Sequence, residues 1–225
     1  MYQVTDRSEI KKTQQKLKDR GFYTGIVDGI WGPLSQAALE ASQGEKVVSP
    51  AFDTTRIIWA TKVSKEFILK VRDIAKKLQM PTEGANWLMA CMAFETGETF
   101  SPTIKNGAGA PYYGLIQFGA AAAKDAGTSL PALLKMTAEE QLDYVYAFFK
   151  PYTGKLKTLS DIYMRILWPA AVGKPEDYVI FDQNVRPTAY VQNKGLDINK
   201  DGKVTKAECA AKVQEKYVRG QKFIA

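Results

Sequence analysis

The segment that most constrains the fold of this chain is a continuous apolar run from Trp87 to Phe94, which follows Pro81. Proline interrupts helical structure, so we expect a helix that begins at Thr82 and carries Glu95 at its end. No apolar run in the chain is longer, and spanning a bilayer takes about 18 such residues. We therefore expect a globular protein without stable membrane insertion.

Other segments also have helical signatures. Residues 67–78 place apolar side chains at a 3.6-residue spacing, and further helices are expected after the caps Ser64, Thr137 and Ser160. Residues 101–119, by contrast, contain four glycines and two prolines, which predict turns and short strands. The expected fold class is mainly α, with one small irregular or β lobe.

The first 45 residues have the pattern of a separate small helical module. A glycine-rich turn at 22–32 separates two expected helices, one capped by Ser8 and one opened by Pro33. The first helix places Ile10, Gln14 and Leu17 at helical spacing. Residues 46–55 have little periodicity and are expected to form a linker. The expected domains are therefore 1–45 and 56–225, joined by that linker.

Glu95 is the strongest candidate for a chemical role. Apolar side chains of its own helix can exclude water from its carboxyl group, namely Trp87, Met89, Cys91, Met92 and Phe94. Exclusion of water disfavours the charged form and raises the pKa of a carboxyl group, which is what a general acid needs. The alternative is a solvated carboxylate at the end of a helix.

Three short motifs follow one another along the chain: Glu95-Thr96-Gly97, Gly114-Leu115-Ile116-Gln117 and Ala189-Tyr190. They resemble the Glu-Ser-Gly, Gly-Leu-Met-Gln and Ala-Tyr-Asn motifs of the goose-type lysozyme and lytic transglycosylase superfamily, and the chain looks most like the catalytic domain of modular phage endolysins. The resemblance implies an α-helical lysozyme-like domain that cleaves the β-1,4 bond between N-acetylmuramic acid and N-acetylglucosamine. It implies that Glu95 protonates the glycosidic oxygen, with Gln117 and Tyr190 as supporting catalytic groups.

The same resemblance suggests which residues bind the glycan. Thr96 stands where the family has serine, and Val191 stands where it has asparagine, with Asn193 as the nearest substitute. The substrate-binding candidates are Thr96, Tyr112, Tyr113, Phe118 and Asn193. For Gln117 and the tyrosines, the alternative is a hydrogen-bonded core residue.

Glycoside hydrolysis commonly uses two carboxyl groups. No acidic residue lies between Glu98 and Asp125, so Glu98 is the only near partner and is a second catalytic candidate. A mechanism with Glu95 as the one acid and base fits better. The sugar's own 6-hydroxyl (transglycosylase) or a water (muramidase) would then complete the reaction, and both possibilities stay open.

The N-terminal turn has its own resemblance. Phe22-Tyr23-Thr24-Gly25, Asp28-Gly29 and Trp31-Gly32 resemble the peptidoglycan-binding-like repeat. The resemblance implies that this module binds the cell wall, with Tyr23, Asp28 and Trp31 as candidates. The alternative is a helical hairpin that packs on the catalytic domain, in which Tyr23 belongs to the core and Asp28 caps the turn.

The amino-acid composition limits which catalytic mechanisms and which binding partners are expected. Histidine is absent, which excludes Ser-His and Cys-His nucleophilic pairs, and both cysteines are expected to be reduced thiols.

The net charge is +7, and residues 1–45 carry equal numbers of acidic and basic side chains, so the excess lies on residues 46–225. Such an excess favours an anionic polymer. Peptidoglycan is the expected partner, anionic lipopolysaccharide is a second candidate, and nucleic acid is not expected because no recognised binding motif is present. A monomer is expected.

The first residues, from Met1 to Arg7, lack the basic and apolar regions of a signal peptide. We therefore expect synthesis in the host bacterial cytoplasm and action on the periplasmic cell wall. A separate pore-forming protein, or lysis from outside, would deliver the protein to the wall.

The segment 197–208 matches the twelve-residue EF-hand loop. The candidate metal ligands are Asp197, Asn199, Asp201, the Lys203 carbonyl, Thr205 and Glu208. Oxygen ligands in this number suit Ca²⁺, and a single loop favours a structural ion, which is the only cofactor expected. The alternative is a polar turn in which Thr205 and Glu208 form a capping box for the last helix, Ala207 to Arg219, and both can hold together.

The leading interpretation is a peptidoglycan-degrading endolysin. A noncatalytic cell-wall-binding or virion structural protein with a lysozyme-like fold is the second, because a fold alone does not establish chemistry. A calcium-regulated binding module is the third. Replacement of Glu95 by glutamine discriminates between the first two.

Overall fold

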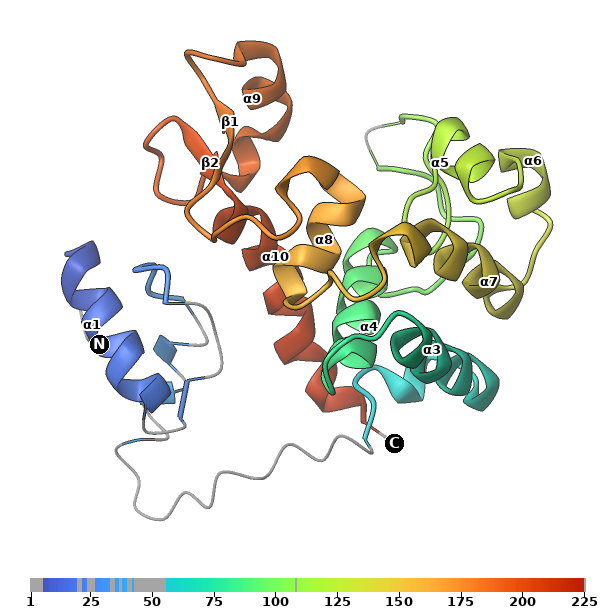
Figure 1. Cartoon of the computed structure of the whole chain (residues 1–225), viewed down its shortest axis with the longest axis horizontal. Coiled ribbons are helices and arrows are strands. Elements are labelled where there is room, and N and C mark those ends of the chain that lie inside the picture. The colour runs from blue at the N-terminus through green and yellow to red at the C-terminus, as the bar shows by residue number, and fades with distance from the viewer. Residues whose placement is uncertain are drawn as a thin grey trace. The chain divides into compact units, whose positions relative to one another are not determined.

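The structure is a computed structural model that describes residues 6–19, 22–23, 27–32, 35–36, 38–39, 42, 56–107 and 109–224. The described part is mainly helical and contains a small two-stranded antiparallel sheet, which confirms the expected fold class (Figure 1). Within it, no helix has the length and apolar character needed to cross a membrane.

The chain divides into two compact units. One comprises residues 1–53 and 175–208, and the other comprises residues 54–174 and 209–225. This division differs from the expected domains, because residues 175–208 group with the N-terminal residues. The expected linker at 46–55 lies outside the described residues.

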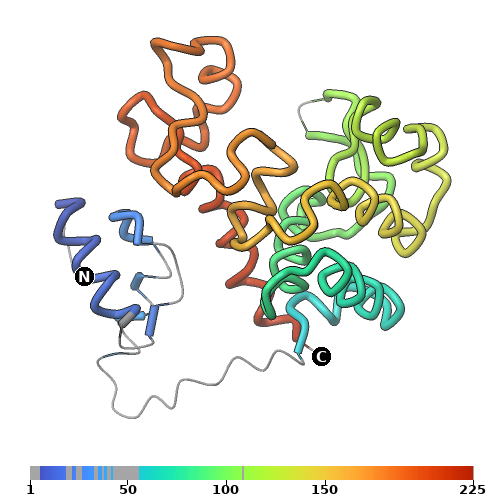
Figure 2. The backbone as a smooth tube through the Cα atoms, viewed as in Figure 1, coloured from blue at the N-terminus to red at the C-terminus, as the bar shows by residue number. Residues whose placement is uncertain are grey.

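The larger unit is organised around helix α4 (Gly84–Glu95). All residues from Leu88 to Ala93 are buried, as expected for a helix that is apolar on every side. Helices α3 (Lys65–Lys77) and α8 (Leu159–Leu167) pack against it, and α3 also packs against α7 (Ala138–Phe149). In Figure 2 the chain can be followed from α3 into α4, then through the irregular segment after α4, and back through α7 to α8. The helix begins two residues later than predicted, after a turn at 82–83.

Side-chain caps define where these helices begin. Ser64 accepts from the Phe67 amide, and Thr137 forms a capping box with Glu140, both as predicted. Helix α8 is different, because the Thr158 hydroxyl accepts from the Asp161 amide and Ser160 lies inside the helix. The predicted cap at Ser160 is therefore wrong by two residues. Either side chain can accept such a bond, so the sequence alone did not distinguish them.

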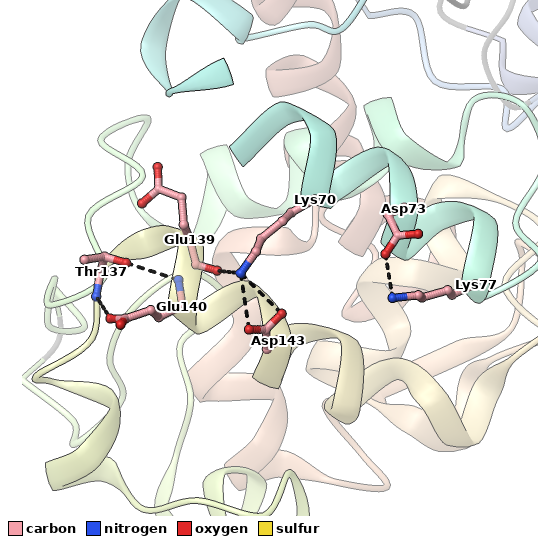
Figure 3. Close-up of polar contacts among 7 residues, drawn as sticks. All are labelled: Lys70, Asp73, Lys77, Thr137, Glu139, Glu140 and Asp143. Carbon is pink, nitrogen blue, oxygen red and sulfur yellow. Dashed lines mark hydrogen bonds and ion pairs between the residues drawn. The ribbon is translucent and has the colours of Figure 1, made fainter. Parts of the chain in front are cut away.

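A lysine joins α3 to α7, as Figure 3 shows. Lys70 Nζ donates to the Glu139 carbonyl at 2.9 Å and lies 3.2 Å from Oδ2 of Asp143. Asp73 and Lys77 form an exposed pair one turn apart on α3. The buried faces hold the two helices together, and the lysine adds a polar contact between them at the surface.

The irregular lobe follows α4. Its predicted short strands are reduced to isolated bridges, in which Tyr113 pairs with Lys105 and with Phe118. Two short helices come next, α5 (Ala120–Asp125) and α6 (Leu130–Leu133), and α5 packs against α7. This lobe therefore rests on α7 through turns and short helices rather than through a sheet.

The smaller unit contains a two-stranded sheet, whose second strand lies inside the expected metal loop 197–208. Strand β1 (Val179–Asp182) pairs antiparallel with β2 (Lys203–Thr205), and helix α9 (Pro187–Asn193) packs against both strands. Helix α10 (Lys206–Gly220) begins directly after β2, close to the predicted start.

The N-terminal residues of this unit include helix α1 (Arg7–Asp19), in which Ile10, Gln14 and Leu17, the residues predicted to lie at helical spacing, are all buried. The helix begins one residue before Ser8, and the Asp6 carboxylate accepts from the Ser8 amide at 2.8 Å. The predicted cap at Ser8 is therefore wrong, and Asp6 caps the helix instead. Residues 35–36, 38–39 and 42 are helical, where the second helix was expected.

Within the larger unit, the fully buried Trp59 contacts the C-terminal part of α10 and the residues that follow it. Its indole Nε1 donates to the Lys216 carbonyl at 3.0 Å, and its ring stacks on Phe223 at a centroid distance of 4.7 Å. Gly220 allows this approach, because a Cβ there would lie 2.4 Å from the indole nitrogen. The last helix is thus part of the same core as α4.

Candidate functional site

Glu95 is the last residue of α4, and its side chain is partly exposed. The aromatic rings of Phe94 on α4 and Tyr163 on α8 meet edge to face at a centroid distance of 5.5 Å. Cys91, one turn before Glu95, and Tyr163 are both buried. The carboxyl group therefore stands where the apolar core of the larger unit reaches the surface.

Burial raises the pKa of Glu95 from 4.5 to about 8. The pKa values of Tyr163 and Cys91 are raised as well, mainly by burial and secondly by the charge of Glu95. Because Glu95 affects both, both side chains lie near its carboxyl group. No described residue forms an ion pair or a hydrogen bond with the Glu95 carboxyl group. Nothing within the described part therefore stabilises its charged form, and the protonated acid predominates at neutral pH.

Glu98, the second catalytic candidate, has a different environment. Lys216 Nζ lies 2.5 Å from its Oε1, and Arg219 Nε lies 3.0 Å from its Oε2. Both cations belong to α10. Each oxygen of this carboxylate thus has a charged partner, and the residue anchors the turn after α4 to the last helix.

Thr96 ends helix α4 rather than facing a ligand. It is fully buried, its hydroxyl donates to the Met92 carbonyl at 2.7 Å, and it accepts from the Phe100 amide at 3.0 Å. The hydroxyl proton and one acceptor lone pair are thus used within the chain, and burial keeps the other lone pair from a sugar. This geometry gives no support to the prediction that Thr96 binds substrate.

Gln117 lies in the irregular lobe with a left-handed backbone, φ 53°. Its Nε2 donates to the carbonyls of Ile104 and Gly114 at 3.4 and 3.3 Å. Its Oε1 is buried and has no hydrogen-bond partner among the described residues. The side chain therefore retains one unused acceptor, which a ligand donor could occupy.

The aromatic candidates of the lobe separate by burial. Phe118 is 1% exposed and meets Phe148 edge to face, so it belongs to the core, and this burial gives no support to its predicted contact with substrate. Tyr112 is 46% exposed, and its ring lies against Gly119, where a Cβ would come within 2.6 Å. Tyr113 is partly exposed. Of these three aromatic candidates, Tyr112 is therefore the most exposed.

Tyr190 and Asn193 belong to the smaller unit, on α9. The Tyr190 hydroxyl donates to Oδ2 of Asp197 at 2.7 Å, and this bond raises the pKa of the tyrosine. Asn193 donates from Nδ2 to the Ala189 carbonyl at 3.0 Å. Their predicted roles at the sugar stay predictions.

Two of the three wall-binding candidates of the N-terminal segment, Tyr23 and Asp28, bond to Gln14, which is fully buried. Its Nε2 lies 3.0 Å from the Tyr23 hydroxyl and 2.9 Å from Oδ1 of Asp28, and its Oε1 accepts from the Gly29 amide. Tyr23 is 5% exposed, and burial raises its pKa to about 12. Trp31 is partly exposed, and its Nε1 donates to Gln36 at 3.1 Å. Tyr23 and Asp28 thus hold this segment together, and Trp31 offers the exposed surface.

The expected capping box at the last helix is present. Glu208 accepts from the Thr205 amide at 2.9 Å, and the Thr205 hydroxyl accepts from the Glu208 amide at 3.3 Å. Asn199, Asp201 and Lys203 are exposed. In the described part of the chain, no three Cys, Asp or Glu side chains are gathered closely enough to hold a metal ion by themselves.

No protein-family model matches the chain, and no curated protein matches it. The functional interpretation therefore depends on the residues and on their geometry.

Sequence reasoning missed Gln141, which positions the lobe. Gln141 is fully buried on α7, and its Nε2 donates to the carbonyls of Pro102 and Leu133 at 2.6 and 3.0 Å. Its Oε1 accepts from the Leu115 amide at 3.2 Å. A signal was present, because Gln141 precedes Val145 by four positions and so shares the apolar face of that helix.

Proposed function

We propose that this protein is a peptidoglycan-cleaving glycosidase in which Glu95 acts as the general acid on the β-1,4 bond between N-acetylmuramic acid and N-acetylglucosamine. The observation that carries the proposal is the position of Glu95. A partly exposed carboxyl group at the end of a buried apolar helix, with a pKa of about 8, supplies a proton at neutral pH.

In this reaction Glu95 donates its proton to the glycosidic oxygen as the bond from that oxygen to the muramic acid C1 breaks. The carboxylate that results then accepts a proton from a water or from the sugar's 6-hydroxyl, whichever attacks C1. Two cations engage Glu98, and the chain has no acidic residue from 99 to 124. Both facts support a mechanism in which one carboxyl group serves first as acid and then as base.

Other features of the lobe suit a glycan. Gln117 Oε1 can accept from a sugar hydroxyl or from an acetamido N–H, and the exposed ring of Tyr112 offers a surface on which a sugar ring can pack. The positive charge of residues 46–225 favours encounter with an anionic wall polymer. In this proposal the N-terminal segment adds wall binding, to which the partly exposed Trp31 contributes.

The test compares Glu95→Gln with Glu66→Gln on purified peptidoglycan. Glu66 is exposed in the first turn of α3 and undergoes the same chemical change away from the proposed site. We expect Glu95→Gln to release soluble fragments at least about 100-fold more slowly and Glu66→Gln to match the original protein. Undiminished release by Glu95→Gln would contradict Glu95 as the general acid. No release by an original protein that still sediments with the wall would favour a noncatalytic wall-binding protein.

Mass spectrometry of the released fragments identifies the attacking group. A hydrolase leaves a reducing end, whereas attack by the 6-hydroxyl leaves a 1,6-anhydro end that is lighter by one water. Either product supports cleavage at the muramic acid C1, and the absence of both in a preparation that binds peptidoglycan contradicts the proposed glycosidase activity.

A further inference from the structure

Two buried carboxylate oxygens in the loop 197–208 lack a partner. They are Asp197 Oδ1 and Glu208 Oε1, and neither accepts a hydrogen bond from any described residue. Asp197 is 7% exposed and Glu208 is 0% exposed. A buried charged oxygen without a partner is costly, so such an oxygen points to a missing donor or cation.

The other oxygen of each carboxylate is bonded within the same loop. Asp197 Oδ2 accepts from the Gly202 amide at 3.0 Å, and Glu208 Oε2 accepts from the Thr205 hydroxyl at 2.7 Å. These bonds fix both carboxylates at the two ends of the loop and leave one oxygen of each unused. Gly202 has φ 81°, and a side chain there would meet Gln183, so the bend depends on glycine.

Further oxygens are available nearby. Asn199 and Asp201 are exposed and make only local bonds, to each other and to the next amides of the loop. Strand β2 is paired with β1, which fixes the backbone that carries the Lys203 carbonyl. Carboxylate, amide and carbonyl oxygens in this combination suit Ca²⁺, which accepts irregular coordination, better than Mg²⁺, which requires near-octahedral geometry.

Tyr190 connects the same carboxylate to helix α9. Its hydroxyl donates to Asp197 Oδ2, the oxygen that also accepts from Gly202. An outer contact of this kind orients a metal ligand, and loss of such a contact commonly weakens metal binding. Asp197 is therefore linked to the middle of α9 by this hydrogen bond.

We propose that the loop 197–208 binds one Ca²⁺ ion through Asp197 Oδ1 and Glu208 Oε1, and that Tyr190 transmits occupancy of this site to helix α9. Asn199, Asp201 and the Lys203 carbonyl complete the coordination when the two exposed side chains turn toward the ion. The proposal does not depend on the proposed glycosidase activity, because it concerns only binding and the stability of α9.

The binding test is calorimetric titration of the full chain, freed of metal by chelation, with CaCl₂ and separately with MgCl₂. We expect one Ca²⁺ per chain with a dissociation constant of about 1 mM or lower, and weaker Mg²⁺ binding. Glu208→Gln should abolish saturable binding, whereas Glu215→Gln, an exposed change on the same helix, should leave it unchanged. Asn199→Ala, which alters only an exposed side chain, should weaken binding even if Glu208→Gln fails to fold.

The proposal of a site is overturned if the original chain takes up no Ca²⁺ at about 10 mM, or if Glu208→Gln folds and still binds as the original does.

Hydrogen exchange tests the connection to α9. We expect Ca²⁺ to slow amide exchange in residues 187–193 of the original chain. In Tyr190→Phe we expect binding about tenfold weaker and no such slowing at saturation. An equal effect of Ca²⁺ on α9 in both proteins overturns the role of Tyr190.

Discussion

Lys216 Nζ lies 2.5 Å from Oε1 of Glu98, and this contact joins residues that are 118 positions apart in the sequence. Glu98 follows Glu95 by three residues and has a left-handed backbone, φ 72°. Arg219 holds the second oxygen of the same carboxylate. The last helix therefore fixes the turn that carries the chain away from the proposed acid.

A double-mutant cycle between Glu98→Gln and Lys216→Met should detect this link. Because both side chains are largely buried, we expect each single change to lower the free energy of unfolding by about 1–3 kcal/mol, and the pair to lower it by less than the sum. Urea denaturation measures all four proteins. The exposed pair Lys212 and Glu215 is the matched control. A coupling no larger than that of the control contradicts a structural role for Glu98.

The raised pKa of Glu95 also predicts a pH dependence of stability. The unfolded chain releases this proton near pH 4.5, whereas the folded chain releases it near pH 8. The folded state therefore binds more protons between these values, and stability should fall as pH rises from about 4.5 to about 8. A tenfold difference in proton affinity between the folded and unfolded states corresponds to about 1.4 kcal/mol, so the loss should reach a few kcal/mol.

Glu95→Gln removes this titration. Its free energy of unfolding should vary less with pH than that of the original chain, and at pH 9 the variant should be the more stable of the two. Denaturation series at pH 5, 7 and 9 make the comparison. Parallel pH curves for the two proteins would exclude a raised pKa at Glu95.

Gln141→Leu should loosen the lobe that contains Gln117. The change keeps a similar volume but removes the bonds to Pro102, Leu133 and Leu115, so buried backbone groups lose their partners. We expect a loss of about 2–4 kcal/mol in the free energy of unfolding. Faster proteolysis within residues 102–115 should accompany it. Gln221→Leu, an exposed change, is the control, and equal effects of the two changes would contradict the role of Gln141.

Two glycines of the N-terminal turn offer a matched comparison. Gly29 has φ 78°, and a Cβ there would lie 2.5 Å from Arg7 Cγ, whereas a Cβ at Gly32 meets nothing within 4 Å. Gly29→Ala should therefore destabilise this segment by about 1–2 kcal/mol, and Gly32→Ala should be neutral or slightly stabilising. Hydrogen exchange of α1 amides reports the difference. Similar exchange in the two variants would mean that the turn tolerates a side chain at Gly29.

Much of the fold could be predicted from local sequence. The run from Trp87 to Phe94 identified the buried helix, and Ser64 and Thr137 marked helix starts, because apolar periodicity and caps act over a few residues. Ser160 failed as a cap because Thr158 could make the same bond. The grouping of residues 175–208 with the N-terminal residues had no local signal.

The candidate site was predictable only in part. The apolar neighbours in its own helix predicted that the pKa of Glu95 is raised, and the structure agrees. Burial of Thr96 and Phe118 could not be predicted in the same way, because the lobe has no regular period that assigns inward and outward positions. The partners of Glu98 and Gln141 come from distant segments, and a sequence without its fold does not reveal them.

An NMR titration of the glutamate side-chain carboxyl carbons, with Glu95→Gln used to assign the Glu95 resonance, tests whether Glu95 can be the general acid. We expect one glutamate resonance with a midpoint near pH 8, present in the original chain and absent from the variant. If the resonance that the variant lacks instead has a midpoint near 4.5, Glu95 is an ordinary ionised carboxylate at neutral pH and cannot be the general acid.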